Sequence, residues 1–472
     1  MDKKTRRLIF YSFVFLFIIA GLGVVFYCDG WRITLKNCSI KQLPNCSVQF
    51  QKTGAVFIQT NPKGVIIKIG EEIFGDKSGL IQNGTLVDEL LPGNYKVEIE
   101  KNNYLAWAKN IAVESGLVTE ISKIVLIPQN LEKNLVPLAK SPYNFWVNSE
   151  GKIVFENNAN LYYQAQDSQA IKLRGDKLIV WSDDNNKIIT ADSKSQTYYL
   201  YQLDNLSQAL NITASLNNLQ KITIKNIKFH PLDSNRLIIQ GKNNLLYILD
   251  PNQLKLENIV KDPVLIWTIN SPNIYYVKKS PATNLKSQIY NLVSFNLISK
   301  TENFSFELPS QLINKSFSGI SVSADKIALL ADTGNLYLFN QQNQDFKQIA
   351  SSTENFVISL DSKKIAFWDK DGELNIYFAE DYQKGIIKKA GDVISFNFYL
   401  KTNGTIIKNI SWYKDSSHLF VETQTSVDFI EIDDRLPINK YTLIENTSDF
   451  NYQLDLNRLY FIQNNGLYFN NI

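Results

Sequence analysis

Three cysteines, Cys28, Cys38 and Cys46, are the side chains of this chain that are best suited to covalent chemistry. Cys38 and Cys46 are close together in sequence, so they could form a small disulfide loop in an oxidising compartment. Their spacing fits no common zinc pattern. Two interpretations stay open for the pair, a disulfide or two reduced structural cysteines.

Histidine chemistry is limited to His230 and His418, the two histidines of the chain, each of which falls in a predicted turn between strands. A hydrolytic triad needs a histidine beside a nucleophile and a carboxylate, and no Gly-x-Ser-x-Gly elbow occurs. We therefore interpret both as ordinary turn histidines. The sequence predicts no catalytic residue, no bound metal and no cofactor.

An uncharged apolar run occupies residues 8–27 and follows a basic start, residues 1–7. At about 1.5 Å per residue, a helix of this length crosses a bilayer core of roughly 30 Å. The basic start should stay in the cytoplasm, so everything after the run is delivered outside. Bulky residues at the end of the run, Val24 to Tyr27, favour a retained single-pass anchor over a cleaved signal peptide, which is the alternative.

The exported part of the chain is electrically neutral. Residues 1–7 hold four of the 49 Lys and Arg residues and one of the 46 acids, which leaves 45 of each sign. A nucleic-acid-binding protein normally shows a basic excess, because contacts with phosphate dominate its affinity. Nucleic acid is therefore excluded as a predicted partner.

After the anchor, short runs of Val, Ile, Tyr and Phe alternate with clusters of Asn, Asp, Gly and Ser, which predicts an all-β exported region. Residues 28–53 are interpreted as a juxtamembrane linker. A small domain follows at 54–127, and a break at Pro128-Gln129-Asn130 separates it from a larger one at 131–472. The strands predicted in the small domain are Ala55 to Gln59, Val65 to Ile69, Tyr95 to Glu100 and Val118 to Leu126.

The small domain contains the segments Pro62-Lys63-Gly64-Val65 and Leu91-Pro92-Gly93-Asn94-Tyr95, with Asn103-Tyr104 after them. In this series it resembles the PEGA domain, a small extracytoplasmic β-sandwich, although Lys63 and Val65 replace the Glu and Ala of the name. The resemblance implies an envelope module without catalytic residues.

The large domain is built from a repeat in which a large apolar residue is followed seven or eight positions later by an aliphatic one. A pair formed by an aliphatic residue and tyrosine, such as Leu161-Tyr162 or Leu336-Tyr337, comes about 10 residues after that in most units. Such a period indicates one four-stranded sheet per unit, as in a β-propeller. The first and second residues of the eight units are Trp146 and Ile153, Trp181 and Ile188, Phe229 and Leu237, Trp267 and Ile274, Ile320 and Ile327, Ile358 and Ile365, Trp412 and Leu419, Tyr452 and Leu459.

Closure of the ring can also be predicted. The last unit stops after its third strand, and Leu131 to Leu138 is a spare strand that could complete it. Eight blades are favoured and seven are the alternative. The turns Ser323-Ala324-Asp325-Lys326 and Leu360-Asp361-Ser362-Lys363 resemble those of WD40-like propellers of the TolB type. We interpret the recurrent tryptophans as packing contacts between blades.

Two classes of function remain. The first is a membrane-anchored, extracytoplasmic, non-catalytic binding or scaffold protein of the cell envelope, whose propeller face binds a protein or a glycan. The second is a propeller hydrolase or lyase acting on envelope polymers, which a cluster of two carboxylates and a basic residue at one mouth of the channel would favour. The longest insertions, Lys279 to Ser287 and Ala390 to Lys408, predict the binding loops. The residues predicted there to contact a partner are Lys279, Ser280, Asn284, Lys286, Lys401, Asn403 and Lys408.

Overall fold

The protein is described by a computed structural model that covers residues 3–36, 47–79, 82–165, 168–280, 289–399, 406–447 and 449–472. The chain divides into two compact units. The first unit contains Met1–Asn130 together with two later segments, Asp381–Lys388 and Asp433–Lys440. The second unit contains the rest of the chain from Leu131 onward.

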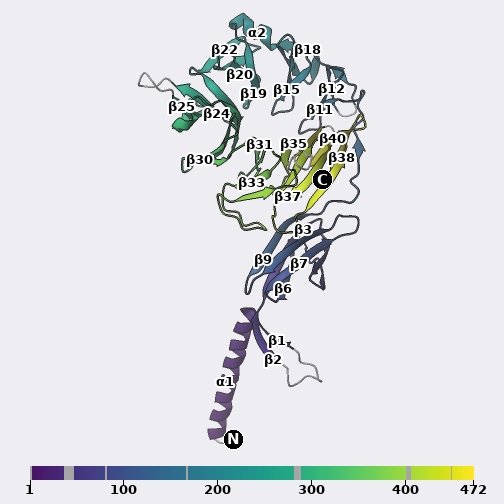
Figure 1. Ribbon diagram of the computed structural model, residues 1–472, viewed down its shortest axis with the longest axis vertical. Coiled ribbons are helices and arrows are strands. Elements are labelled where there is room, and N and C mark those ends of the chain that lie inside the picture. Colours follow the sequence, from purple (N-terminus) through teal and green to yellow (C-terminus); the bar gives the residue numbers. More distant parts are fainter. Residues whose placement is uncertain are drawn as a thin grey trace. The chain divides into compact units, whose positions relative to one another are not determined.

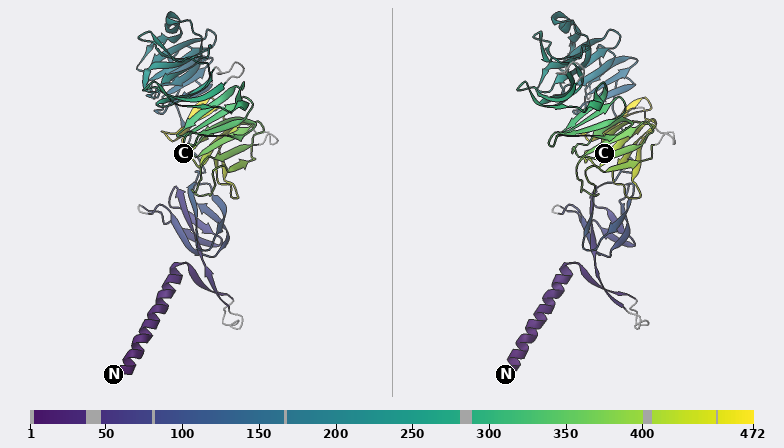
Figure 2. Two further views of the ribbon diagram at one scale, coloured as in Figure 1. Left: turned by 90° about the vertical axis from the view of Figure 1, so that its left-hand side faces the viewer. Right: turned by 60° about the vertical axis from the view of Figure 1, so that its left-hand side comes forward.

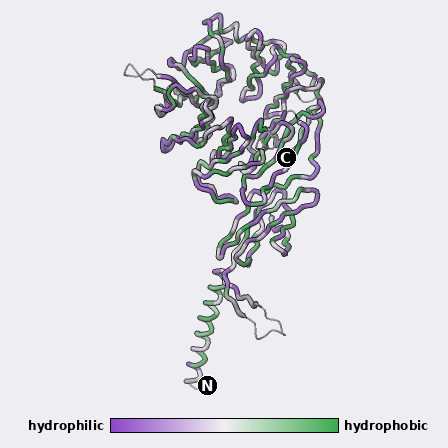
Figure 3. The backbone as a smooth tube through the Cα atoms, viewed as in Figure 1, coloured by the Kyte–Doolittle hydropathy of each residue, from purple (hydrophilic) through white to green (hydrophobic). Residues whose placement is uncertain are grey.

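The first unit begins with helix α1, Lys3–Cys28. Its part Thr5–Cys28 has a mean hydropathy of 2.6, and it is the one helix of the described residues that is long and apolar enough to cross a membrane. Figure 3 shows this apolar character along the helix. The helix ends where Asp29 and Gly30 follow, with Gly30 at a φ of 85°, a conformation that glycine adopts without strain.

A two-stranded antiparallel sheet, β1 (Trp31–Lys36) and β2 (Ser47–Lys52), comes directly after α1. The sequence analysis interpreted this part of the chain as a linker and did not predict these strands. Cys28 is a free, exposed thiol. Cys38 and Cys46 lie outside the described residues, so the predicted disulfide stays a prediction.

Two further sheets share the hydrophobic core of the first unit. One has the strand order β6-β3-β9 and the other β5-β4-β7-β8. Val56, Ile99, Trp107 and Ile111 are among the side chains buried between them. The strands are β3 (Gly54–Asn61), β4 (Ile66–Ile69), β5 (Glu72–Gly75), β6 (Thr85–Leu90), β7 (Gly93–Glu100), β8 (Trp107–Val113) and β9 (Val118–Val125).

The second unit is a series of four-stranded antiparallel sheets, and all but one of those described are built from strands that are consecutive in sequence. This order, repeated around a centre in Figure 1, is that of a β-propeller. The described residues form seven such sheets of four consecutive strands: β11 (Asn144–Val147), β12 (Ile153–Asn157), β13 (Asn160–Gln164) and β14 (Ile171–Lys172); β15 (Lys177–Trp181), β16 (Lys187–Asp192), β17 (Thr197–Gln202) and β18 (Asn205–Asn211); β19 (Ile224–His230), β20 (Asp233–Gly241), β21 (Leu246–Asp250) and β22 (Lys255–Val260); β23 (Val264–Asn270), β24 (Asn273–Ser280), β25 (Ile289–Asn296) and β26 (Thr301–Glu307); β27 (Phe317–Ser323), β28 (Lys326–Ala331), β29 (Leu336–Asn340) and β30 (Asp345–Ala350); β31 (Thr353–Ile358), β32 (Lys364–Asp369), β33 (Leu374–Phe378) and β34 (Val393–Phe396); β35 (Ile407–Trp412), β36 (His418–Thr423), β37 (Ser426–Glu431) and β38 (Lys440–Glu445).

The eighth four-stranded sheet of this unit joins the two ends of the repeat region, in the order β10-β41-β40-β39. Its strands are β10 (Asn134–Leu135), β39 (Phe450–Gln453), β40 (Arg458–Gln463) and β41 (Gly466–Asn471). β10 pairs antiparallel with β41, with Asn134 opposite Phe469 and Leu135 opposite Tyr468. It is much shorter than the predicted strand Leu131 to Leu138. Two further short helices are α2 (Ile212–Leu219) and a 3-10 helix, Ser310–Leu312.

The repeated residues occupy equivalent places in these sheets. The first residue of each unit lies on a first strand, and the second residue, always buried, lies on the second strand. Trp267 Nε1 donates to Gln240 Oε1 and Trp412 Nε1 to the Val357 carbonyl, in both instances from one sheet to the preceding one. Both tryptophans are buried, as expected for packing contacts between sheets, whereas Trp146 and Trp181 are only half-buried.

Candidate functional site

The two predicted insertions leave the propeller at the same end of its sheets. The stretch 281–288 connects the second and third strands of one sheet, and 397–406 connects the fourth strand of a sheet to the first strand of the next. In a four-stranded antiparallel blade these two kinds of connection lie at one end. We call this the insertion end, and define it by Ser280, Lys408, Glu422 and Asp449, which lie at the strand termini beside such connections.

The structure places only some of the predicted partner-binding residues. Lys279 and Ser280 are the last residues of β24, and Lys408 is the second residue of β35. Asn284, Lys286, Lys401 and Asn403 lie outside the described residues. The prediction that Ala390 to Lys408 is one long loop is wrong, because Val393–Phe396 forms the fourth strand β34 of its sheet.

The base of the first insertion is held by a charge cluster on β24. Lys278 Nζ lies 2.8 Å from Glu302 Oε1 and 3.6 Å from Asp262 Oδ2. The hydroxyl of Tyr276 also donates to Glu302, at 3.3 Å. Burial raises the pKa of Tyr276, and the two nearby carboxylates raise it further. This tyrosine is therefore a lasting hydrogen-bond donor to the Glu302 carboxylate.

The base of the second insertion is held by a buried carboxylate. The hydroxyl of Tyr399, which directly precedes the undescribed stretch 400–405, donates to Asp428 Oδ2 at 2.9 Å. Asp428 Oδ1 accepts a bond of 2.7 Å from Thr442 Oγ1. Burial and the Asp428 charge raise the pKa of Tyr399, so the phenol keeps its proton. The connection is thereby attached to β37 and β38.

Two carboxylic acids at the insertion end, Glu422 and Asp449, have raised pKa values. Burial raises the pKa of Glu422 to about 7, and the charge of Asp449 adds to this effect while Lys408 opposes it. Burial likewise raises the pKa of Asp449 to about 6, against the lowering effects of Lys408 and of the backbone N–H groups of Phe450 and Phe145. Lys408 sits in a β-bulge between Ile407 and Asn409, opposite Glu422. Two acids that titrate near neutrality beside an ammonium group could transfer protons or bind a cation.

The two histidines lie at the ends of strands and not in the predicted turns. His230 ends β19 and His418 begins β36, and both side chains are buried. His418 Nδ1 lies 2.7 Å from Asp415 Oδ2, and its ring stacks on Phe429 with centroids 4.8 Å apart. Burial lowers the pKa of His230 to about 4, and the nearby Arg236 lowers it further, so this imidazole is neutral. The sequence analysis placed both in turns because their polar neighbours resemble turns.

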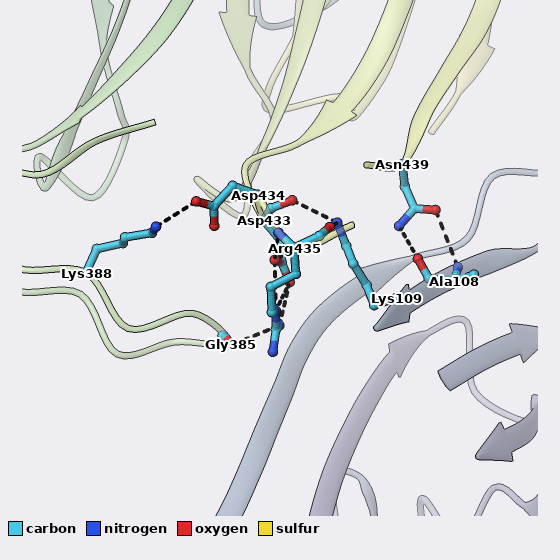
Figure 4. A network of polar contacts seen from close by, with 8 residues as sticks. All are labelled: Ala108, Lys109, Gly385, Lys388, Asp433, Asp434, Arg435 and Asn439. Atoms are coloured by element: carbon cyan, nitrogen blue, oxygen red, sulfur yellow. Dashed lines mark hydrogen bonds and ion pairs between the residues drawn. The ribbon is translucent and has the colours of Figure 1, made fainter. Parts of the chain in front are cut away.

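A polar network in the first unit was not predicted from the sequence (Figure 4). Lys109 on β8 is fully buried, and its Nζ donates to the carbonyls of Asp433 at 2.8 Å and Arg435 at 2.7 Å. Asn439 bonds both ways with the backbone of Ala108, at 3.1 and 3.4 Å. The segment Asp433–Lys440 is thus fixed to this unit by β8.

The same two segments are joined to each other. Arg435 Nη2 donates to the Gly385 carbonyl at 3.0 Å, and Lys388 Nζ lies 2.7 Å from Asp434 Oδ2. Beside them is a cavity of about 560 Å³, whose lining includes Leu117 and Val118 of the β9 region and Ile387. The connections after β33 and β37 are longer than the corresponding four-residue turn 341–344 after β29. This extra length is the feature of the sequence from which the two segments could have been recognised.

Among the residues that the structure describes, no group of three His, Cys, Asp or Glu side chains is placed to hold a metal ion. No protein-family model matches the chain, and no curated protein matches it in sequence. The PEGA resemblance therefore stays a prediction.

Solved structures with a similar fold exist. They include the β-propeller domain of Cps50 (Swd1) from Myceliophteria thermophila, with 9% identity, a TM-score of 0.41 and coverage of 72% of this chain and 100% of that one. The computationally designed protein Ika8 has 10% identity, a TM-score of 0.45, and 72% and 100% coverage. BamB from Moraxella catarrhalis has 10% identity, a TM-score of 0.44, and 72% and 99% coverage. At these identities the likeness concerns the fold alone.

Proposed function

We propose that this protein is a membrane-anchored, extracytoplasmic, non-catalytic binding or scaffold protein of the cell envelope, whose propeller binds a protein or a glycan at the insertion end. The observation that carries this proposal is the connectivity, which brings both long insertions to one end of the sheets. Rigid sheets beneath loops are the usual basis of specific binding, because they hold the loops in place without an ordering cost.

The finer architecture is part of the same proposal. The four-stranded sheets of the second unit are eight blades of one closed ring, in which β10 supplies the outer strand of the last blade. The two sheets at 54–127 form a PEGA-like sandwich. Side chains buried between the last and first sheets, among them Phe145, Phe155, Tyr460 and Ile462, support closure.

The proposed topology has the N-terminus in the cytoplasm and the C-terminus outside, because the four cations of residues 1–7 precede α1. Protease added to intact cells or spheroplasts should degrade the second unit and spare a tag fused before Met1. Protection of a tag after Ile472 would contradict this orientation.

The binding proposal is tested by crosslinking the full chain in its own cells. Three versions are compared: the native chain, one with 281–287 shortened to two glycines, and one with 400–405 shortened in the same way, which leaves β34 intact. A matched control replaces Gln342 and Asn343, in a turn at the opposite end of the sheets, by glycine. We expect a specific crosslinked partner to disappear with one or both shortened insertions and to remain in the control. Unchanged crosslinks in all versions would place the binding surface elsewhere.

A hydrolase or lyase is the second candidate function, and the carboxylic acids Glu422 and Asp449 with Lys408 are the observation that favours it. An acid with a pKa of about 7 is suited to protonating a leaving group. The binding function is preferred because Asp449 already accepts hydrogen bonds from Phe450 and Phe145, a structural role between the last and first sheets. Turnover of envelope glycans or peptides by the purified protein, abolished by Glu422→Gln, would reverse this preference.

A further inference from the structure

The sheet formed by β1 and β2 is amphipathic. Its register places Trp31 opposite Lys52, Ile33 opposite Phe50, and Leu35 opposite Val48. Residues on a strand alternate between two faces, so Trp31, Phe50 and the ion-paired Lys52 belong to one face, which we call the apolar face, whereas Arg32 and Gln51 belong to the other, the polar face.

In the described part of the protein the apolar face is covered only in part, by Phe26 of α1, whose ring lies edge-on to Trp31 with the centroids 6.3 Å apart. No other strand pairs with this sheet, and it stands apart from the remaining strands of the first unit in both views of Figure 2. Phe50 is 66% exposed and Trp31 is 36% exposed. An isolated hairpin is only marginally stable in water, so an apolar surface must complete its burial.

The hairpin is held rigidly to the end of α1. Asp29 bonds both strands, because its Oδ1 lies 2.8 Å from Lys52 Nζ and its Oδ2 accepts from Trp31 Nε1 at 3.2 Å. The hydrogen bond from Lys52 lowers the pKa of Asp29, which stays charged. On the other face, Arg32 bonds Glu89 at 2.9 Å and lies 3.8 Å from the centre of the Tyr27 ring.

This arrangement encloses an apolar cavity of about 560 Å³ between the last turn of the helix and the hairpin. Its lining consists of Gly23, Phe26, Tyr27, Trp31, Arg32 and Phe50. If α1 spans the membrane as proposed, its last turn lies at the outer interface, where tryptophan and tyrosine side chains prefer to reside. The cavity and the apolar face then lie beside lipid acyl chains, and Arg32 at the edge of the cavity is the lining residue that can meet the headgroups.

We propose that the β1–β2 hairpin is an interfacial membrane-docking element, whose apolar face rests on the outer leaflet and whose cavity takes a lipid acyl chain. This proposal rests on the proposed anchoring by α1. Thr53, which follows β2, is joined to the end of α1, because its N–H donates to the Gly30 carbonyl at 2.9 Å. A hairpin that lies along the membrane therefore fixes the direction in which the chain leaves the bilayer at Thr53. A single helix followed by a free linker would leave that direction open.

The test uses the full chain in lipid nanodiscs, in a background where Cys28, Cys38 and Cys46 are replaced by serine. A spin label is attached at Phe50→Cys on the apolar face, at Gln51→Cys on the polar face as a matched control, or at Leu16→Cys inside α1. Collision with oxygen reports a lipid environment, and collision with a soluble nickel chelate reports water. We expect positions 16 and 50 in lipid and position 51 in water.

The outcomes separate the two proposals. Position 16 in lipid with positions 50 and 51 both in water would overturn the docking proposal and leave the anchor intact. Position 16 in water would overturn the anchor and, with it, the docking proposal that rests on the anchor. A second measurement without labels is amide hydrogen exchange in nanodiscs, where Phe50→Ser should accelerate exchange of β1 and β2 about tenfold more than Gln51→Ser. Equal exchange in the two variants would also overturn docking.

Discussion

The two units bury their apolar side chains in different ways. In the first unit, a single cluster between two sheets contains the core, and its members all come from residues 56–126. In the second unit, the core is divided into clusters that each join one sheet to the next, such as Ile238 and Trp267 from β20 and β23. A single core makes a unit stable by itself, whereas a divided core makes every sheet depend on its neighbours. The following substitutions test that difference.

The largest effect is expected for Trp107→Ala, which empties the centre of the single core. Trp107 is 2% exposed, and loss of such a side chain costs about 4 kcal/mol of unfolding free energy. Hydrogen exchange on the full chain should show faster exchange throughout β3 to β9, while the second unit keeps its protection. The control is Ile73→Ala, because Ile73 is 69% exposed. Equal loss of protection in both units would contradict a separate core.

Interruption of the closing strand should have the next largest effect. The triple variant Leu135→Ser, Val136→Ser and Leu138→Ser removes the side chains that pack beside β41, and Val136 and Leu138 contact the cluster between the last and first sheets. We expect about 3 kcal/mol of lost stability, spread over several sheets because β41 becomes a free edge and the contact between the last and first sheets is weakened. The measurement is thermal unfolding, with Tyr143→Ser as control since Tyr143 is 74% exposed. A local loss confined to β41 would mean that the ring does not depend on closure.

Lys109→Met tests how the later segments are attached to the first unit. It removes two hydrogen bonds to the carbonyls of Asp433 and Arg435 but keeps most of the buried volume. The segment Asp433–Lys440 should lose about 2 kcal/mol of local stability, visible as faster amide exchange there. Lys96→Met on the neighbouring strand β7, where the side chain is 57% exposed, should change nothing. Unchanged exchange in Lys109→Met would show that Asn439 and Arg435 suffice to hold the segment Asp433–Lys440 in place.

The smallest effect is the pH dependence caused by Glu422. Its pKa of about 7 in the folded chain exceeds the usual value of roughly 4.3 for an unfolded chain. The folded state therefore holds the proton more tightly, so stability should fall as the pH rises from about 4.5 to 7 and then level off. Glu422→Gln should remove about 1–2 kcal/mol of this fall in the free energy of unfolding, measured by denaturant unfolding at pH 5 and pH 8.

Asp449 and the exposed acid Glu354 provide the comparisons for the Glu422 experiment. A shallower slope below pH 6 should remain in Glu422→Gln, because Asp449 keeps its own raised pKa of about 6. The control Glu354→Gln changes an exposed acid on β31 and should leave the native pH profile as it is. A native-like slope in Glu422→Gln would show that Glu422 is not the titrating group.

The sequence predicted the β-propeller because its repeats have a regular period, and the N-terminal helix because its apolar run is long and free of charges. Each repeat is marked by the same apolar residues, such as Ile327 and Tyr337, which recur because equivalent strands bury equivalent positions. The strands β5, β6 and β8 of the first unit were missed. β6 carries Asp88 and Glu89, and an edge strand with such residues has no clear alternation of apolar and polar positions.

The candidate site could be predicted only in outline. The insertions were recognised from their length, but β34 was hidden in one of them because Val393–Phe396 is a short strand with only two buried residues. The pairing of Glu422 with Asp449 could not be foreseen, since their pKa values depend on burial and on approach between different sheets. Lys109 was likewise missed, because a lysine in sequence resembles an exposed residue unless its carbonyl partners are known.

The inclusion of Asp381–Lys388 and Asp433–Lys440 in the first unit has a consequence for the order in which the protein matures. A chain that is synthesised from its N-terminus presents residues 54–127 early, but the carbonyl groups that Lys109 requires arrive only with Asp433 and Arg435. Until then, a lysine destined for full burial stays in water, and β8 stays an open edge to which other chains could add. The first unit therefore begins to fold early and is completed only after residue 440 has been synthesised.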